Sequence, residues 1–287
     1  MDALDSAYAP LETIAARAMS QMTTENFPVA LRLLPAAVRA DLATVYRFAR
    51  FVDDVGDEAP GGPEQRLALL DVVEHQLRGL PGDAALGPVR ALAPLVGSGR
   101  VPLQPFLDLV EANRVDQRRS SYETFEELLE YCALSAAPVG RVVLHLAGAA
   151  SQEAVRLSDS VCAALQVLEH CQDVGEDARA GRVYLPAEEL RAAGVQAADL
   201  TGHATSTGLR GVTVRQVVRA RELLEDGRPL VGLLRGWPRL AVAGFVAGGL
   251  ATADALDAAR HDVLARTVHP SRARTMWHAL SLLARRP

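Results

Sequence analysis

Apolar residues recur at helical spacing along almost the whole chain, and this pattern limits the fold more than any other feature of the sequence. Alanine, leucine and arginine dominate, runs of β-branched residues are short, and no segment alternates as a half-buried strand would. Of the 287 residues, 49% are hydrophobic, which is enough to bury a large core. We therefore expect an all-α fold, with one helical domain over residues 1–287.

The charged residues exclude several classes of function. All 30 basic residues are arginine, because the chain has no lysine. This absence excludes mechanisms that need a phosphate-loop lysine or a lysine Schiff base. The net charge of −5 gives no reason to expect a nucleic-acid partner, since phosphate backbones are bound by clustered positive charge. Small anions remain possible partners for individual arginines.

The remaining composition indicates an intracellular protein. Cys132, Cys162 and Cys171 lack metal-type spacing, and we expect them to be reduced core residues. The first ten residues are acidic and do not resemble a secretion signal, so we expect a cytoplasmic location. The longest uncharged stretch, residues 240–253, is too short to span a membrane and is expected to form a buried helix. Peripheral contact with a membrane remains open.

Two acidic segments resemble each other, and each closes a long apolar helical run. They are residues 53–58 (DDVGDE) and residues 173–177 (DVGED). In a helix, residues four apart lie about 40° from each other around the axis, so Asp53 and Asp57 should project side by side, as should Asp173 and Asp177. Each pair can share a hard cation.

Polar residues extend both pairs backwards along their helices. Arg50 and Tyr46 continue the first stripe, and Gln166 with Glu169 or His170 continues the second. Polar groups on otherwise apolar helices are costly to bury without partners, so the stripes should face a cavity. Carboxylate oxygens suit Mg²⁺, whose shell is often completed by substrate phosphates. A diphosphate bridging the two helices would meet that need.

Other interpretations of the acidic segments are weaker. A single cluster could be solvated surface, but aspartate at a helix C-terminus opposes the macrodipole by about 0.3–1 kcal/mol per residue, so two instances need a reason such as bound cations. A di-iron bundle requires Glu-x-x-His, and none of the 7 histidines has this spacing. A Rossmann fingerprint is also missing, because residues 97–99 (GSG) do not open a glycine-containing helix.

The chain resembles the squalene and phytoene synthases over nearly its whole length. The resemblance rests on residues 46–57 (YRFARFVDDVGD), on residues 166–177 (QVLEHCQDVGED) and on residues 181–186 (GRVYLP). It implies a terpenoid synthase helical bundle around a central cavity, a prenyl diphosphate substrate and roughly two or three Mg²⁺ ions. The implied metal ligands are Asp53, Asp57, Asp173 and Asp177.

Further blocks narrow the resemblance within the family. Residues 131–140 (YCALSAAPVG) are similar to a central helix that contributes a tyrosine, here Tyr131, to the cavity. Residues 25–30 (ENFPVA), residues 138–140 and Gln172 resemble the bacterial hydroxysqualene synthases of hopanoid pathways. In those enzymes presqualene diphosphate is ionised and water captures the rearranged cation, so NADPH is not expected.

Three positions depart from the family pattern. Thr23 stands where histidine is usual, Glu169 where asparagine is usual and His261 where tyrosine is frequent. Glu169 matters most, because asparagine there lies beside the second metal site in the family. A carboxylate could bind metal directly or act on water, and the sequence leaves both roles open.

The resemblance suggests a role for each candidate residue. Arg50 and Arg266 would add positive charge around the diphosphate. Phe27, Tyr46 and Tyr131 would line the cavity and stabilise the cation. Gln166 and Glu169 would position water, and the remaining candidates for substrate binding are Thr23, Asn26, Gln172 and Arg182.

Two rival functions follow from the same family. The first is condensation of two prenyl diphosphates to presqualene diphosphate, squalene or phytoene. The second is a non-catalytic assembly factor, although such relatives lose aspartates and this chain retains both pairs. Contact with other enzymes of the squalene pathway is also expected, because substrate and product are lipophilic.

Overall fold

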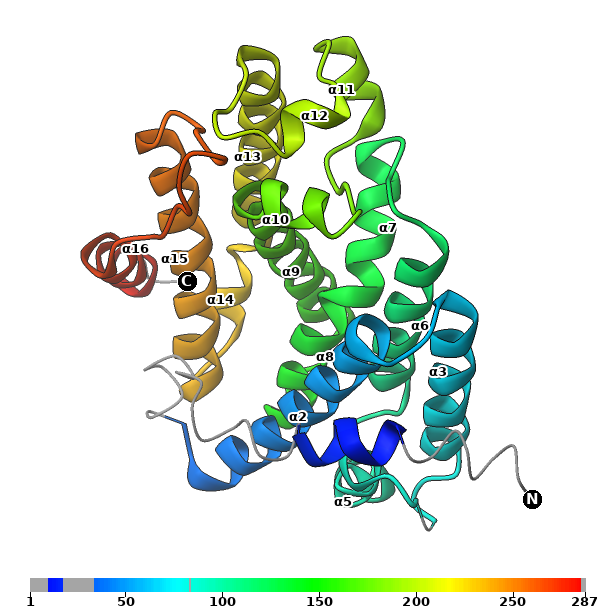
Figure 1. Ribbon diagram of the computed structural model, residues 1–287. Coiled ribbons are helices and arrows are strands. Elements are labelled where there is room, and N and C mark those ends of the chain that lie inside the picture. Colours follow the sequence, from blue (N-terminus) through cyan, green and yellow to red (C-terminus); the bar gives the residue numbers. More distant parts are fainter. Residues whose placement is uncertain (1–9, 18–33, 83, 285–287) are drawn as a thin grey trace. The chain divides into compact units, whose positions relative to one another are not determined.

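The computed structural model describes residues 10–17, 34–82 and 84–284, which form helices joined by turns and short loops (Figure 1). No β-strand occurs in these three ranges, where Ser121 and Val183 form an isolated β-bridge. The all-α prediction is therefore confirmed.

The helices group into two compact units. Unit 1 contains the described residues up to Arg119 together with residues 145–148, and unit 2 contains residues 120–144 and those from Ala149 onward. The helices of unit 1 are α2 (Ala36–Glu58), α3 (Pro63–Arg78), α4 (Gly87–Arg90), α5 (Ala93–Gly97) and α6 (Gln104–Arg118). The expectation of one domain over residues 1–287 stays a prediction.

Unit 2 contains the longer helices of the C-terminal part. They are α7 (Phe125–Ser135), α8 (Ala137–Leu146, except its last two residues), α9 (Gln152–Gln172), α10 (Val174–Arg179), α11 (Ala187–Ala192), α12 (Ala197–Leu200), α13 (Thr207–Gly227), α14 (Leu230–Leu233), α15 (Trp237–Ala258) and α16 (Arg272–Ala284). Side-chain caps begin four of them: Thr124, Ser151, Ser206 and Ser271 each accept a hydrogen bond from the backbone N–H three residues later.

In unit 1, α2 packs against α3 and α6 through an apolar face. Val45, Phe48, Val52 and Val55 recur in steps of three and four and are buried. The rings of Phe48 and of Phe106 on α6 pack in a T-shaped arrangement, with centroids 5.5 Å apart. This packing fixes which side of α2 faces the core and therefore which side carries the polar stripe.

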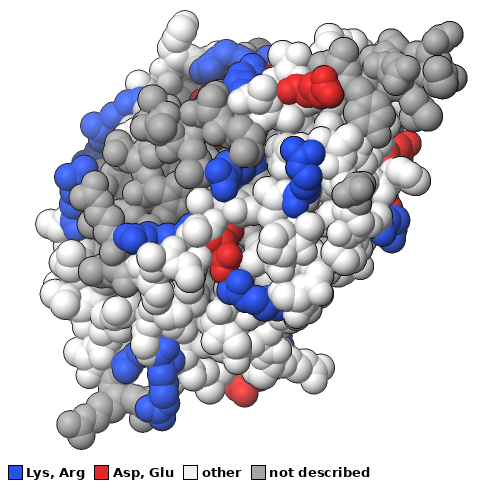
Figure 2. Space-filling model, turned by 90° about the horizontal axis from the view of Figure 1, so that it is seen from below, with Lys and Arg blue, Asp and Glu red and all other residues white. Residues whose placement is uncertain are grey.

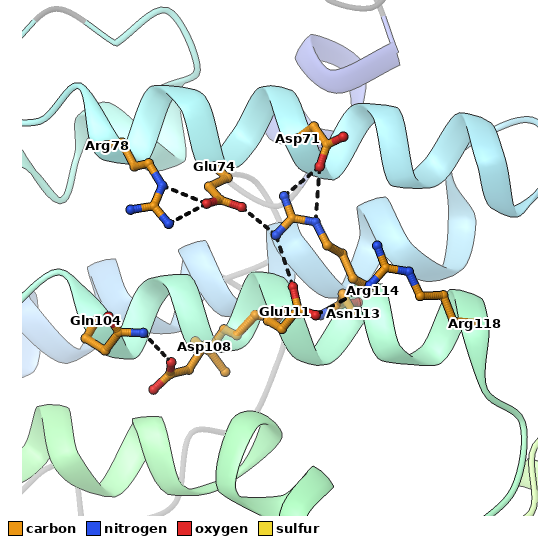
Figure 3. Close-up of polar contacts among 10 residues, drawn as sticks. Asp71, Glu74, Arg78, Gln104, Asp108, Glu111, Asn113, Arg114 and Arg118 are labelled. Carbon is orange, nitrogen blue, oxygen red and sulfur yellow. Dashed lines mark hydrogen bonds and ion pairs between the residues drawn. The ribbon is translucent and has the colours of Figure 1, made fainter.

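A buried arginine joins α3 to α6 (Figure 3). The Arg114 guanidinium lies 2.7 Å from Asp71 Oδ1, 2.5 Å from Glu74 Oε2 and 3.2 Å from Glu111 Oε2. Only 9% of the Arg114 side chain is exposed, so these carboxylates compensate a charge that is costly to bury alone. The network fixes the rotation of α6 and thereby the position of the neighbouring Asn113.

In unit 2, α9 packs closely against α13 and α15. A Cβ atom at Gly227 would lie 2.5 Å from Val161 Cγ2, and one at Gly249 would lie 2.9 Å from Leu165 Cδ2. Both distances are too short for a side chain, so these glycines permit the close approach of the helices. The result is a tightly packed support for the polar residues at the end of α9.

One helix of the described chain, α15, is long and apolar enough to cross a membrane. Half of its most apolar window is buried inside the protein, and it contacts α9, α13, α14 and α16. Core helices meet the same length and composition criteria. These contacts agree with the prediction of a buried helix over residues 240–253, and the cytoplasmic location stays a prediction.

The three cysteines are free thiols, as expected. Cys132 and Cys171 are buried and Cys162 is partly exposed. Burial raises the pKa of Cys132 to about 12, that of Cys162 to about 11 and that of Cys171 to about 12. All three are therefore protonated and poorly nucleophilic at neutral pH.

Arginine side chains are spread over the face that Figure 2 shows, among mostly uncharged residues. Because the chain has no lysine, every side chain that is blue in this view is an arginine. Guanidinium groups bind phosphate and carboxylate oxygens through paired hydrogen bonds. The positive charge of this protein is therefore of the type best suited to directional recognition of oxyanions.

Candidate active site

The first aspartate motif lies on the last turns of α2, in unit 1. Tyr46, Arg50, Asp53 and Asp57 follow one another on this helix in steps of four, three and four, so their side chains share a face. Asp53 and Asp57 are exposed, whereas Tyr46 and Arg50 are partly buried. The stripe predicted from the sequence is therefore present on a single helix.

Asp54, between the two outer aspartates, has a different role. Its side chain is only 2% exposed. Arg50 Nε lies 3.1 Å from Asp54 Oδ1, an ion pair without hydrogen-bond geometry, and Arg17 Nη2 lies 3.5 Å from Asp54 Oδ2. Asp54 thus compensates the charge of Arg50 and restrains its position, an interaction that the sequence analysis did not identify.

Asn113 on α6 contacts the first motif directly. Its Nδ2 donates hydrogen bonds to Asp53 Oδ1, at 3.1 Å, and to the Leu109 carbonyl, at 3.2 Å. A Cβ atom at Gly56 would lie 2.2 Å from Asn113 Oδ1, so only glycine at position 56 leaves room for this amide. Gly56 was visible in the motif, but nothing in the sequence connected it to Asn113.

The environment of Asp53 disfavours its charged form. Surrounding protein raises the pKa of Asp53 to about 6, and the charge of Asp57 adds to the effect, whereas the Asn113 hydrogen bond and Arg50 oppose it. The side chain is nevertheless exposed. The carboxylate of Asp53 can therefore be reached from solvent, although the protein around it disfavours its negative charge. Such an environment favours the binding of a cation.

The C-terminus of α2 is capped by polar side chains. Arg66 Nη1 and Gln117 Nε2 donate to the Gly56 carbonyl at 3.0 and 2.9 Å, and Arg66 Nε donates to the Ala59 carbonyl at 3.1 Å. A cation at a helix C-terminus offsets the macrodipole. The charge of Arg66 therefore offsets part of the cost of placing Asp57 at the C-terminus of α2. A bound metal is then less necessary to explain an aspartate at this position.

The second aspartate motif lies in unit 2, where α9 passes into α10. Asp173 stands at the junction, and its carbonyl accepts a hydrogen bond from Asp177 N at 2.8 Å. Asp177 lies in the first turn of α10, where negative charge is favourable. The prediction that both aspartates oppose the dipole at a free helix C-terminus is therefore wrong for this pair, because α10 follows α9 directly.

The effects of the carboxylates of the second motif on one another indicate that they lie close together. Burial by the surrounding protein raises the pKa of Asp173. The charges of Asp177 and Glu176 raise this pKa further, whereas His170 and His269 oppose the shift. The pKa of Glu169 is raised in the same way by its surroundings, with His170 opposing and with Asp173 and Asp177 adding to the shift. Glu169 therefore belongs to this carboxylate group.

His170 connects the predicted residues of α9 to α10. Its Nδ1 lies 3.7 Å from Asp177 Oδ2, and its Nε2 lies 3.3 Å from Gln166 Nε2. From helical spacing alone, His170 was only an alternative to Glu169 on the polar stripe of α9. Both residues belong to the site in the structure, but in different positions: His170 is buried behind the carboxylates, and Glu169 is exposed.

Three tyrosines pack behind His170. The Tyr184 ring stacks on the imidazole with centroids 3.8 Å apart, and Tyr131 lies 5.5 Å from Tyr184 and 5.3 Å from Tyr122. Tyr131 is only 7% exposed. This aromatic cluster fixes His170, and Tyr131 is embedded in it; the place of Tyr131 on the cavity wall stays a prediction.

The loop between α15 and α16 reaches the second motif. Gln172 Nε2 donates a hydrogen bond to the Val268 carbonyl, and a Cβ atom at Gly175 would lie 2.9 Å from Leu264 Cδ2. His269 lowers the pKa of Asp173 by its charge, which indicates that this histidine lies close to the motif. Gln172 thus holds the loop, and His269 is a neighbour that its isolated position in the sequence did not reveal.

The remaining predicted residues differ in how closely they approach the motifs. The Arg182 backbone N–H donates to the Asp177 carbonyl at 2.8 Å, so Arg182 follows the second motif directly. Arg266 is exposed and forms no hydrogen bond or ion pair with any described residue. Thr23, Asn26 and Phe27 lie outside the described residues.

The aspartates of the two groups offer carboxylate oxygens as ligands. Within the described ranges, no cluster of three or more histidine, cysteine, aspartate or glutamate residues has the geometry to hold a metal ion alone. Paired carboxylates with open positions suit a cation that keeps water and phosphate ligands.

Comparison with known proteins gives a consistent match. Residues 21–274, which include both aspartate motifs, match the squalene/phytoene synthase family. The chain is 37% identical over 216 residues to hydroxysqualene synthase of Rhodopseudomonas palustris, covering 74% of this chain and 72% of that protein. It is 32% identical over 263 residues to hydroxysqualene synthase of Zymomonas mobilis, covering 91% and 88%.

A solved structure shares the fold. Squalene synthase HpnC from Alicyclobacillus acidocaldarius superposes with a TM-score of 0.78 at 36% sequence identity, covering 90% of this chain and 96% of that one. The helical arrangement expected from the sequence is therefore confirmed.

Proposed function

The chain belongs to the squalene/phytoene synthase family and is an enzyme, and from this premise we propose that it converts presqualene diphosphate to hydroxysqualene and diphosphate. The observation that carries this proposal is the retention of both aspartate pairs in a chain similar to hydroxysqualene synthases over up to 91% of its length. In the proposed reaction the C–O bond to diphosphate breaks, the cation rearranges, and water adds to it with loss of a proton.

The carboxylate groups fit Mg²⁺. In each group the charge of one aspartate raises the pKa of the other: Asp57 raises that of Asp53, and Asp177 raises that of Asp173, which reflects like charges held close together. A divalent cation would relieve that repulsion, and Asp53, Asp57, Asp173 and Asp177 are the ligands that we propose. Bound Mg²⁺ supplies Lewis-acid stabilisation of the departing diphosphate.

On α2, the surrounding residues would orient the ligands and the substrate. Asn113 holds one oxygen of Asp53 and leaves the other available. Asp54 restrains Arg50, whose charge also reaches Asp53. We propose that Arg50 contributes positive charge beside the diphosphate while its own charge is balanced by Asp54.

Glu169 is the group that we propose as proton acceptor for the attacking water. Its carboxylate is exposed and forms no hydrogen bond or ion pair with another described residue, whereas Asp177 has His170 beside it. Gln166, one turn earlier on α9, can hold the water through its amide. His170 and the tyrosines behind it would keep this part of α9 rigid.

Product identification tests the proposal. The purified protein should convert presqualene diphosphate to hydroxysqualene with Mg²⁺, without NADPH, and the oxygen should come from ¹⁸O-labelled water. With farnesyl diphosphate alone it should release little diphosphate. Formation of presqualene diphosphate, squalene or phytoene from the shorter substrate would instead identify a condensing synthase.

A further inference from the structure

Helix α16 carries its largest apolar side chains on the side that faces solvent. Met276, Trp277 and Leu280 are 60, 58 and 60% exposed, more than any other large hydrophobic residue of the described chain. Their spacing places them in one stripe along the helix. A surface helix normally turns such a stripe toward the core, so the orientation of α16 needs an explanation.

The inner side of α16 is held by polar contacts. His278 Nε2 lies 2.9 Å from Asp254 Oδ2 on α15, and Arg274 Nε lies 3.4 Å from the same oxygen. Arg221 on α13 also contacts Asp254, at 2.9 Å. The contacts of His278 and Arg274 attach α16 to α15, beside which it lies in Figure 1, and keep its apolar stripe outward.

The charge of this segment is opposite to that of the whole chain. Residues 271–287 contain four arginines and no acidic residue, whereas the chain has a net charge of −5. Arg272 is exposed and has no ion-pair partner in the part of the chain that the structure describes. Tryptophan and apolar residues beside arginines are typical of helices that lie in the interface of a membrane.

We propose that α16 docks the protein reversibly on membranes that contain anionic lipids. Met276, Trp277 and Leu280 would enter the region below the headgroups, and Arg272 would lie among the lipid phosphates. A second copy of the chain fits this face less well, because a two-fold interface would bring the arginines of one α16 against those of the other. The inference does not depend on the reaction proposed above.

Vesicle flotation of the full chain tests this surface. We expect binding to vesicles of equal parts phosphatidylcholine and phosphatidylglycerol, and much weaker binding to phosphatidylcholine alone. The double variant Trp277→Ser/Leu280→Ser should reduce partitioning about 100-fold, because each inserted side chain contributes about tenfold. Arg272→Gln should reduce it about fivefold, and only on the anionic vesicles.

A matched control distinguishes binding through this stripe from nonspecific hydrophobic adsorption to the vesicles. Val214→Ser/Val218→Ser removes two exposed apolar residues from α13, 40 and 49% exposed, and should leave partitioning unchanged. In a Trp237→Phe background, the fluorescence of Trp277 should shift to the blue on anionic vesicles. Absence of vesicle binding, or equal binding by the α16 double variant with native helicity, would overturn the proposal. So would a dimer in sedimentation that the double variant dissociates.

Discussion

At the scale of single residues, the proposed chemistry depends on Asp53 and Asp173. Asp53→Asn or Asp173→Asn should lower diphosphate release at least about 100-fold, because a metal ligand and its charge are lost. The melting temperature should not fall, since each change also removes repulsion from a neighbouring aspartate. Stopped diphosphate assays and thermal melts measure the two effects.

A matched substitution distinguishes the motifs from acidic residues in general. Asp226→Asn changes an exposed aspartate of α13 and should leave turnover unchanged. If both motif variants kept wild-type turnover, the proposed mechanism would be wrong.

Gly56 makes a second prediction at this scale. Gly56→Ala would place a Cβ atom 2.2 Å from Asn113 Oδ1 and should cost about 1–3 kcal/mol of unfolding free energy. Gly248→Ala is the control, because open space surrounds its Cβ position within a helix, and it should be neutral or stabilising by up to about 1 kcal/mol.

A double variant tests the cause of the Gly56→Ala effect. Asn113→Ala combined with Gly56→Ala should cost less than the sum of the two single changes, because the clash is removed. Denaturant unfolding provides all four free energies. Strict additivity would mean that Asn113 is not the obstacle.

At the scale of helices, periodicity predicted the elements well and their partners poorly. The stripes on α2 and α9 follow from spacing within one helix, so the sequence was sufficient to place Tyr46, Arg50, Asp53 and Gln166. The contact between Asn113 and Asp53 joins residues 60 positions apart and depends on how α6 is rotated. That rotation is fixed by packing and by Arg114, which local patterns do not encode.

The error in the macrodipole argument has the same origin. A run of helical spacing shows that a helix exists, but not whether another helix continues it. Asp173 marked the end of α9 in the sequence pattern, whereas the structure continues hydrogen bonding into α10. His170 was equally difficult to assign, because its stacking on Tyr184 joins α9 to a later loop.

Glu189 provides a prediction about how α11 is attached to α13. Burial raises the pKa of Glu189, but Arg215, Arg219 and Gln216 donate hydrogen bonds that outweigh burial and bring the pKa below its usual value. Glu189→Gln should therefore cost about 1–2 kcal/mol of unfolding free energy at neutral pH.

The pH dependence of this cost follows from linkage. Because the pKa of Glu189 is lower in the folded than in the unfolded protein, its stabilisation is complete above the unfolded value near 4.3 and is lost as pH falls through the folded value. The difference between wild type and Glu189→Gln should shrink below about pH 4. Equal differences at pH 7 and at low pH would contradict this assignment.

At the scale of the whole molecule, the open question is whether the two compact units unfold together. The family match over residues 21–274 includes residues of both, which favours one cooperative domain. Gly56→Ala acts in unit 1 and Glu189→Gln in unit 2. If the chain is one domain, both should shift the same single calorimetric transition, and their free energies should add within about 0.5 kcal/mol. Two transitions, each moved by only one variant, would instead show that the units fold independently.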